Sequence, residues 1–464
     1  MPHQEVRVRF APSPTGNFHI GNLRTALFNW LFARHAGGKL LVRIEDTDIA
    51  RSREEFTAII LDTLAWCDIQ SDEPICFQSQ RSEIYAFWAS ELLTRNALYR
   101  CYCTQEEMRQ RARGVSKTGD EYFFYDGLCR DRKEILDKPY VLRFRVPRDR
   151  TEVVIDDLLH GTLRFPLSAI DDFVVVRSDG SSMYNFTVVV DDALMKISHV
   201  LRGDDHIVNT PRQVLIYEAA GWAIPHFAHM PLILGKDGTK LSKRDAATSV
   251  IDYRRGGILA EALCNYLVRL GWASGDREII ARDELIKIFS LKNVGIKGAQ
   301  FDYVKLLWMN SVYLKEMNAH DLMRRIENDV MPGFREKLNN FREEQIVCLI
   351  HLYQKRCKTL VELASSLVTL SYVPEIQPEE RSLITSLHHD AARELIHWLA
   401  STTPITVDLI KQYVQTYTFE RSISLADIAG PLRRALTGSS AAPSIAEIIM
   451  CLGREESIAR LRKL

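Results

Sequence analysis

Two apolar patterns alternate in the N-terminal part of this chain, and this alternation limits the possible folds more than any other sequence feature. Short extended runs occur at 6–10 and 39–48. Between them, Leu23, Leu27 and Leu31 recur at the spacing of one helix face. Strands that alternate with helices predict a parallel sheet, because parallel strands need a crossover connection, which is usually helical. We therefore expect an α/β fold.

The alternation continues and then returns later in the chain. Ser52 and Glu55 have the spacing of a capping box, which predicts the start of a second helix. A further strand is expected at 197–202, with Thr210 and Pro211 as the N-cap and first residue of the helix that follows it. Two α/β halves would then flank a segment that lacks the alternation, and the chain beyond about residue 320 is expected to be helical. The expected segments are 1–99, 100–190, 191–245, 246–320 and 321–464.

Composition excludes several classes of protein. The 464 residues suggest about three domains, and 60 Lys and Arg balance 60 Asp and Glu, which argues against non-specific polyanion binding. No apolar run approaches the roughly 18 residues that span a bilayer, and the N-terminus lacks a secretory pattern. The 9 cysteines are scattered and resemble reduced thiols more than a disulfide framework. We expect a soluble, cytoplasmic protein with no membrane contact.

A first candidate binding element lies between the first strand and the first helix. Ligands bind at this edge of open α/β sheets, and the N-terminus of a helix attracts anions. Gly21 removes a side chain where a nucleotide could approach, and His19 could donate a hydrogen bond to a phosphate. Taken alone, the pattern also fits an ordinary loop histidine followed by a turn glycine.

A second element follows an apolar run near residue 234. Lys240, Lys243 and Arg244 come after two glycines, so a movable loop could bring cations to a triphosphate. On its own, a basic turn fits a solvated surface equally well.

Together, in this order, the two elements resemble the two ATP signatures of class I aminoacyl-tRNA synthetases. The flanking segments 9–16, 43–48, 184–192 and 202–213 are similar to bacterial glutamyl-tRNA synthetases. The resemblance extends over essentially the whole chain. It implies a Rossmann-type parallel-sheet catalytic domain that carries an inserted α+β domain for the tRNA acceptor arm. A helical stem-contact domain and an all-α anticodon-binding region would follow.

The resemblance also implies an activity. ATP with Mg²⁺ would activate glutamate as glutamyl-adenylate, and the glutamyl group would pass to the 3′ end of tRNA(Glu) for protein synthesis by a monomeric enzyme. Two alternatives remain open. One is a relaxed-specificity copy that charges tRNA(Gln) with glutamate, and the other is a tRNA-binding regulator without catalytic activity.

The resemblance assigns roles to particular residues. The ATP-binding residues would be Thr15, Gly16, His19, Gly21, Asn22, Lys240, Ser242, Lys243 and Arg244, with His19, Lys240 and Lys243 as the catalytic ones. The glutamate-binding residues would be Arg9, Ala11, Ser13, Glu45, Tyr184 and Arg202. Arg9 would bind the side-chain carboxylate, which matches a guanidinium better than an amide does, and Glu45 would hold the ammonium group. The alternative for Glu45 and Arg202 is a plain ion pair at strand ends. Asn22 departs from the histidine or glycine of the family.

Three clustered cysteines outline a metal site. The candidate ligands are Cys101, Cys103, Cys129 and Asp131, with Tyr122 or Tyr125 as other possible fourth ligands. Structural zinc prefers four Cys or His ligands in a tetrahedron, although Asp is chemically possible. Zinc is therefore a possible cofactor, and the alternative is an empty site with reduced thiols. The remaining cysteines are expected to be thiols in the core or at the surface.

Overall fold

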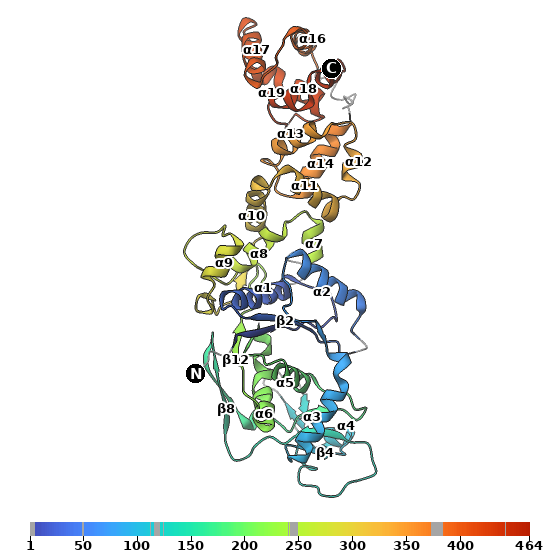
Figure 1. Ribbon diagram of the computed structural model, residues 1–464, viewed down its shortest axis with the longest axis vertical. Helices are drawn as coiled ribbons and strands as arrows, with labels where there is room; N and C mark the ends of the chain where they lie inside the picture. Colours follow the sequence, from blue (N-terminus) through green and yellow to red (C-terminus); the bar gives the residue numbers. More distant parts are fainter. Residues whose placement is uncertain are drawn as a thin grey trace. The chain divides into compact units, whose positions relative to one another are not determined.

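The computed structural model describes residues 5–48, 51–111, 113–115, 121–123, 125–239, 241, 249–372, 384–440 and 442–464, with backbone only at 113–115 and 121–123. The chain divides into two compact units, which are described separately below (Figure 1). Unit 1 consists of residues 1–251 and 264–302, and unit 2 of residues 252–263 and 303–464.

Unit 1 begins with the expected alternation. Its first elements are β1 (Arg7–Phe10), α1 (Ile20–His35), β2 (Lys39–Ile44), α2 (Glu54–Trp66) and β3 (Cys76–Phe77). The strands form a parallel sheet in the order β1-β2-β3. In the interior strand β2, four of the six residues are apolar and every residue after Lys39 is buried, as expected for a strand covered on both faces. The prediction of a parallel sheet is therefore confirmed.

A second parallel pair completes this half of the molecule. It contains α5 (Tyr184–Leu194), β11 (His199–Gly203), a 3₁₀ helix η3 (Asp204–Asn209), α6 (Thr210–Ala220) and β12 (His226–Met230). Strands β11 and β12 are parallel, and the N–H of Ser198 donates to the carbonyl of Arg7 at 2.9 Å, next to β1. In Figure 1, α1 lies on one side of β2, and α5 and α6 lie on the other.

The connection between the two halves carries antiparallel structure. Its elements are η1 (Gln78–Arg81), α3 (Ser82–Thr94), β4 (Leu98–Cys101), α4 (Gln105–Arg111), β5 (Arg113–Val115), β6 (Glu121–Phe123), β7 (Val141–Phe144), β8 (Glu152–Asp157), β9 (Gly161–Pro166), η2 (Leu167–Ala169) and β10 (Val174–Val176). Strands β10, β7 and β4 form an antiparallel sheet, and β5 pairs with β6. The hairpin of β8 and β9 joins the parallel strands, because β8 pairs with β12. This pairing brings part of the connection next to β11 and β12.

The rest of unit 1 contains β13 (Ile233–Leu234), α9 (Arg282–Ile288), η4 (Leu291–Asn293) and β14 (Ala299–Gln300), and the boundary between the units falls within α7 (Val250–Arg255) and α8 (Ala260–Arg269). Unit 2 is otherwise built from α10 (Tyr303–Glu316), α11 (Ala319–Arg325), the π-helical turn η5 (Ile326–Val330), α12 (Phe334–Lys337), α13 (Glu343–Tyr353), α14 (Leu360–Ser371), α16 (Ser386–Ser401), α17 (Val407–Glu420), α18 (Leu425–Thr437), α19 (Ile445–Leu452) and α20 (Arg454–Leu461). These helices share one apolar core. The expectation of a helical C-terminal part is confirmed.

Two helix starts differ from the predictions. Helix α2 begins at Glu54, its N-cap is Arg53, and the predicted capping box at Ser52 does not form. The backbone explains this, because the N–H of Ser52 donates to the carbonyl of Asp48 and the N–H of Arg53 to that of Pro14. Helix α6 includes Thr210 in its first turn and is capped one residue earlier than expected.

The expectation that all cysteines are thiols is also wrong. Cys348 of α13 and Cys451 of α19 form a disulfide in unit 2. They are 103 residues apart in the chain, so their proximity depends on how the helices pack rather than on any local spacing. Among the described residues, no helix has the length and apolar content needed to cross a membrane.

Candidate active site

A cavity of about 450 Å³ in unit 1 collects the predicted site residues. Its lining consists of Arg9, Phe10, Ala11, Pro12, Ser13, Thr15, Gly16, Asn17, His19, Gly21, Asn22, Arg24, Thr25, Glu45, Tyr184, Leu201, Arg202, Gly203, Asp205, His206, Leu232 and Ile233. Every residue that we predicted for the ATP and glutamate sites and that the structure describes is in this set. The cavity lies where β1, β2 and β11 end and α1 begins, which is the edge where open α/β sheets bind ligands.

The N-terminus of α1 is capped by a reciprocal pair of hydrogen bonds. His19 is the N-cap, and its Nδ1 accepts the N–H of Asn22 at 3.2 Å. The side-chain oxygen of Asn22 accepts the N–H of His19 at 3.3 Å. A Cβ atom at Gly21 would lie 3.0 Å from the His19 ring, so glycine leaves room for this ring position. Asn22 therefore helps to hold His19 at the start of α1, where the helix dipole favours an anion.

Buried charges meet where Arg9 and Glu45 form the cavity wall. The Nε of Arg9 donates to both carboxylate oxygens of Asp192 at 3.2 Å. Arg43 donates to Asp192 at 2.6 Å and to Glu45 at 3.1 Å. All four side chains are almost fully buried. Burial opposes ionisation of Asp192, but Arg43 and Arg9 outweigh it and lower the pKa of this carboxyl.

Glu45 belongs to the same buried group. Burial raises the pKa of Glu45 although Arg43 and Arg9 act in the opposite direction. A substrate ammonium group beside this carboxylate would favour its ionised form. The sequence analysis missed Arg43 and Asp192 as site residues, although both lie in segments that carried the family resemblance.

Tyr184 and His206 form a second pair in the cavity wall. The Tyr184 hydroxyl lies 3.2 Å from Nδ1 of His206. Burial, with Glu45 nearby, raises the pKa of Tyr184 to about 12. Burial, with Arg202 nearby, lowers the pKa of His206 to about 4. Both side chains are therefore neutral near pH 7. His206 was not predicted, and the available indication was its place in the segment that starts at Arg202.

The second cationic element is only partly described. Lys240, Ser242, Lys243 and Arg244 lie outside the described residues. The segment before them forms a turn after β13, in which the N–H of Gly235 donates to the carbonyl of Thr239 at 2.8 Å. Leu232 and Ile233 belong to the cavity wall, so this segment starts at the cavity.

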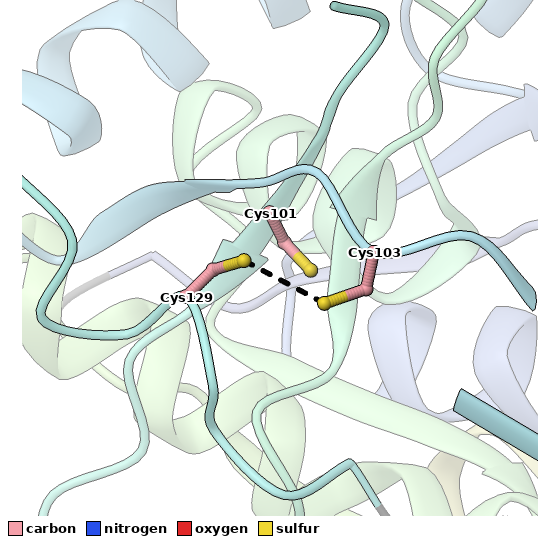
Figure 2. A group of neighbouring side chains, drawn as sticks. All are labelled: Cys101, Cys103 and Cys129. Atoms are coloured by element: carbon pink, nitrogen blue, oxygen red, sulfur yellow. Dashed lines mark hydrogen bonds between the residues drawn. The ribbon is translucent and has the colours of Figure 1, made fainter. Parts of the chain in front are cut away.

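The three clustered cysteines come together in unit 1, as Figure 2 shows. The sulfur atoms of Cys101, Cys103 and Cys129 lie within 4.8 Å of one another. The Tyr125 hydroxyl lies 3.4 Å from the sulfur of Cys101 and accepts the N–H of Cys129 at 2.8 Å. Tyr125 thus places a hydroxyl oxygen beside the Cys101 thiol, at the edge of the three-cysteine cluster.

The prediction of Asp131 as fourth ligand disagrees with this arrangement. The Asp131 side chain is 83% exposed and pairs with Arg145 at 3.0 Å. It is not part of the cluster that the three cysteines form. The preceding residue, Arg130, turns inward to Asp172 at 2.6 Å, which leaves Asp131 facing outward. The side chain of Tyr122 lies outside the described residues.

Comparison with known proteins gives matches along the whole chain. Residues 5–308 match the catalytic domain of class I tRNA synthetases (E and Q), and residues 320–464 match an anticodon binding domain. The glutamate–tRNA ligase of Thermodesulfovibrio yellowstonii is 44% identical, with 99% of each chain covered. That of Pelobacter propionicus is 42% identical over 99% of this chain and 98% of the relative. A solved glutamate tRNA ligase from Elizabethkingia meningosepticum, in complex with its amino acid, is 31% identical with a TM-score of 0.85 and covers 99% of both chains.

Proposed function

We propose, because this chain belongs to the glutamate–tRNA ligase family of class I aminoacyl-tRNA synthetases, that it activates glutamate with ATP and transfers it to the 3′ end of tRNA(Glu). One observation supports this most directly. A single cavity holds all the described residues that the family pattern assigns to glutamate and to ATP. The match of residues 320–464 to an anticodon binding domain supports tRNA as the acceptor.

The buried charges fit the groups of glutamate. Arg9 and Arg202 supply guanidinium groups for carboxylates, and Glu45 supplies a carboxylate for the ammonium group. A guanidinium discriminates against the amide of glutamine, because the amide nitrogen would face a donor instead of accepting from it. Ala11 and Ser13 add little bulk to this part of the wall.

The nucleotide would lie at the N-terminus of α1. Thr15, Gly16 and Gly21 leave the backbone accessible to the phosphates of ATP, which is bound as its magnesium complex. An oxygen of the α-carboxylate of glutamate attacks the α-phosphorus, and the bond to pyrophosphate breaks. His19 at the helix start and Lys243 on the loop after β13 would stabilise the charge on this phosphate, with Lys240 and Arg244 supporting the loop and Ser242 beside them.

Transfer to tRNA requires no nucleophile from the protein. A terminal ribose hydroxyl of the tRNA attacks the activated carbonyl carbon, the ester bond forms, and AMP leaves with the electron pair of the broken C–O bond. The protein contributes by holding the two reactants at the correct distance and angle.

We propose separately that a zinc ion binds at the three-cysteine cluster. Cys101, Cys103 and Cys129 offer three sulfur ligands, and Tyr125 is better placed than Asp131 to be the fourth. Zinc would act structurally, by holding β4 and the segment after β6 together. We further propose that the protein acts as a cytoplasmic monomer with the five segments given above as its domains.

Charging of separate tRNA(Glu) and tRNA(Gln) transcripts with labelled glutamate tests the proposed function. Charging of tRNA(Glu) alone is the expected result. Charging of tRNA(Gln) as well would identify a relaxed-specificity enzyme, whose product needs an amidating partner. Charging of neither, with intact tRNA binding, would replace the proposal by a regulatory role.

A further inference from the structure

Arg202 offers one guanidinium nitrogen to the cavity and uses the rest of its guanidinium to hold its position. The side chain is buried, with 5% of the residue exposed. Its Nε donates to Nε2 of His229 at 3.1 Å, and its Nη2 donates to the hydroxyl of Thr210 at 2.8 Å. The third nitrogen, Nη1, is buried and has no hydrogen-bond partner among the described residues. A buried donor of this kind needs an acceptor, and the cavity is where a ligand can supply one.

His229 is held in turn by Asp157. Its Nδ1 lies 2.6 Å from a carboxylate oxygen of Asp157, and both side chains are completely buried. The backbone N–H of His229 donates to the same oxygen at 3.1 Å. The N–H groups of Leu159 and His160 donate to the other carboxylate oxygen at 2.9 Å, so the carboxylate has a fixed orientation. Because a carboxylate only accepts, Nδ1 of His229 carries the hydrogen. Its Nε2 presents the lone pair to Nε of Arg202, and the hydroxyl of Thr210 lies 3.0 Å from the same atom.

Burial, together with the charge of Arg202, keeps His229 in the neutral form that this arrangement needs. The groups that face it are Asp157 on β8, His160 in the following turn, Arg202 on β11, and Asp204 and His206 on η3. Burial lowers the pKa of His229, Arg202 acts in the same direction, and the bond to Asp157 only partly opposes them. Hydrogen bonds from His229 and from the turn outweigh burial and lower the pKa of Asp157.

We propose that His229, held by Asp157, is a positioning residue that orients Arg202 so that its Nη1 meets a carboxylate of glutamate. This inference rests on the proposed function, which assigns Arg202 to the glutamate site. It also gives the β8–β9 hairpin a role, because Asp157 is the last residue of β8 and reaches the glutamate site through β12 and β11. Neither Asp157 nor His229 lines the cavity.

Two replacements of His229 separate orientation of Arg202 from general support of the fold. In His229→Asn the amide nitrogen can take the place of Nδ1 and bond Asp157, but the shorter side chain leaves Nε of Arg202 without its acceptor. In His229→Gln the amide oxygen can take the place of Nε2 and accept from Arg202. ATP–pyrophosphate exchange in the presence of tRNA gives the KM for glutamate and for ATP separately.

We expect a selective weakening of glutamate binding in His229→Asn that is absent in His229→Gln. His229→Asn should raise the glutamate KM by about 10- to 100-fold, because a displaced guanidinium loses its directed bond, and leave the ATP KM within about 3-fold. His229→Gln should stay within about 3-fold of wild type for both. Equal glutamate KM values in the two variants, or equal losses for glutamate and ATP, would overturn the inference.

Asp157→Asn provides an independent test that also compares the KM for glutamate with the KM for ATP. An amide nitrogen at the position of the carboxylate oxygen would donate to Nδ1, move the hydrogen of His229 to Nε2, and turn a donor toward Arg202. The glutamate KM should rise while the ATP KM stays unchanged, and an unchanged glutamate KM would also contradict the inference. Wild-type enzyme in the same assay distinguishes failure of this inference from failure of the proposed function, because absence of exchange in the wild type would overturn the proposed function itself.

Discussion

The Nε atom of Arg9 lies 3.2 Å from both carboxylate oxygens of Asp192, and neither side chain has more than 5% of its surface exposed. Asp192 also accepts from Arg43 at 2.6 Å. One carboxylate therefore pairs with two buried guanidinium groups and holds Arg9, the one that lines the cavity, in place. The arrangement couples the stability of unit 1 to the geometry of the proposed glutamate site.

Removal of this carboxylate should destabilise unit 1 strongly. In Asp192→Ala, Arg9 and Arg43 lose their shared partner inside the protein, which typically costs about 3–5 kcal/mol. Urea unfolding followed by tryptophan fluorescence measures the change. Glu152→Ala, which breaks an exposed pair with Arg164, is the matched control and should cost less than about 1 kcal/mol. Similar values for the two variants would contradict the role of Asp192.

Arg9→Ala should weaken glutamate binding far more than ATP binding. A hydrogen bond to a charged group contributes about 1.5–3 kcal/mol, so the glutamate Kd should rise by about 10- to 150-fold. The ATP Kd should stay within about 3-fold, because the phosphates are expected at the start of α1. Isothermal titration with each ligand measures both constants. An equal loss of the two affinities would show that Arg9 supports the cavity as a whole.

Much of the fold followed from local patterns. The extended runs and the helix-face spacing of Leu23, Leu27 and Leu31 predicted the parallel sheet. A strand buried on both faces leaves a short continuous apolar run in the sequence, and a helix buried on one face leaves a period of about 3.6 residues. The cavity residues followed from the resemblance to a synthetase family, whose motifs lie at strand ends, where the fold places ligands.

The supporting residues could not be predicted in this way. Asp192 lies 183 residues from Arg9, and Asp157 lies 72 residues from His229, so nothing in the spacing links them. The orientations of Asp131 and Tyr125 could not be predicted for a related reason. Spacing along the chain does not tell which way a side chain faces when its neighbour, here Arg130, turns inward.

The cluster of Cys101, Cys103 and Cys129 should bind about one zinc ion per chain. Tyr125→Phe removes the hydroxyl beside the thiols and should lower zinc affinity by about 10-fold or more, whereas Asp131→Ala should leave it unchanged. Competition with a chromophoric chelator gives the affinity, and elemental analysis gives the stoichiometry. Loss of zinc from the Asp131 variant together with retention in the Tyr125 variant would restore the original choice of ligand.

The disulfide in unit 2 can be tested by counting the cysteines that react with a thiol reagent. Of the 9 cysteines, only Cys348 and Cys451 are paired, so denatured protein treated with iodoacetamide and a chelator should gain seven labels. Prior reduction should raise the number to nine. Mass spectrometry of the intact chain and of its peptides makes the measurement. Nine labels without reduction would show that α13 and α19 are not linked in the purified protein.

Buried neutral histidines should make unit 1 less stable in mild acid. Burial, with His226 nearby, lowers the pKa of His199 to about 4. Burial lowers the pKa of His206 to about 4 as well. In the unfolded chain both return to about 6.5. The unfolded state therefore binds more protons than the folded state between these values, so stability is complete above pH 6.5 and is lost as the pH falls toward 4.

His199→Asn tests this pH dependence outside the cavity. The asparagine amide can take the place of Nδ1 beside the hydroxyl of Ser198, but it does not titrate. Between pH 7 and pH 5 the variant should lose about 1–2 kcal/mol less unfolding free energy than wild type, because one proton-uptake site is gone. Urea unfolding at the two pH values measures the difference. Equal losses in the two proteins would mean that His199 has the same pKa in the folded and unfolded states.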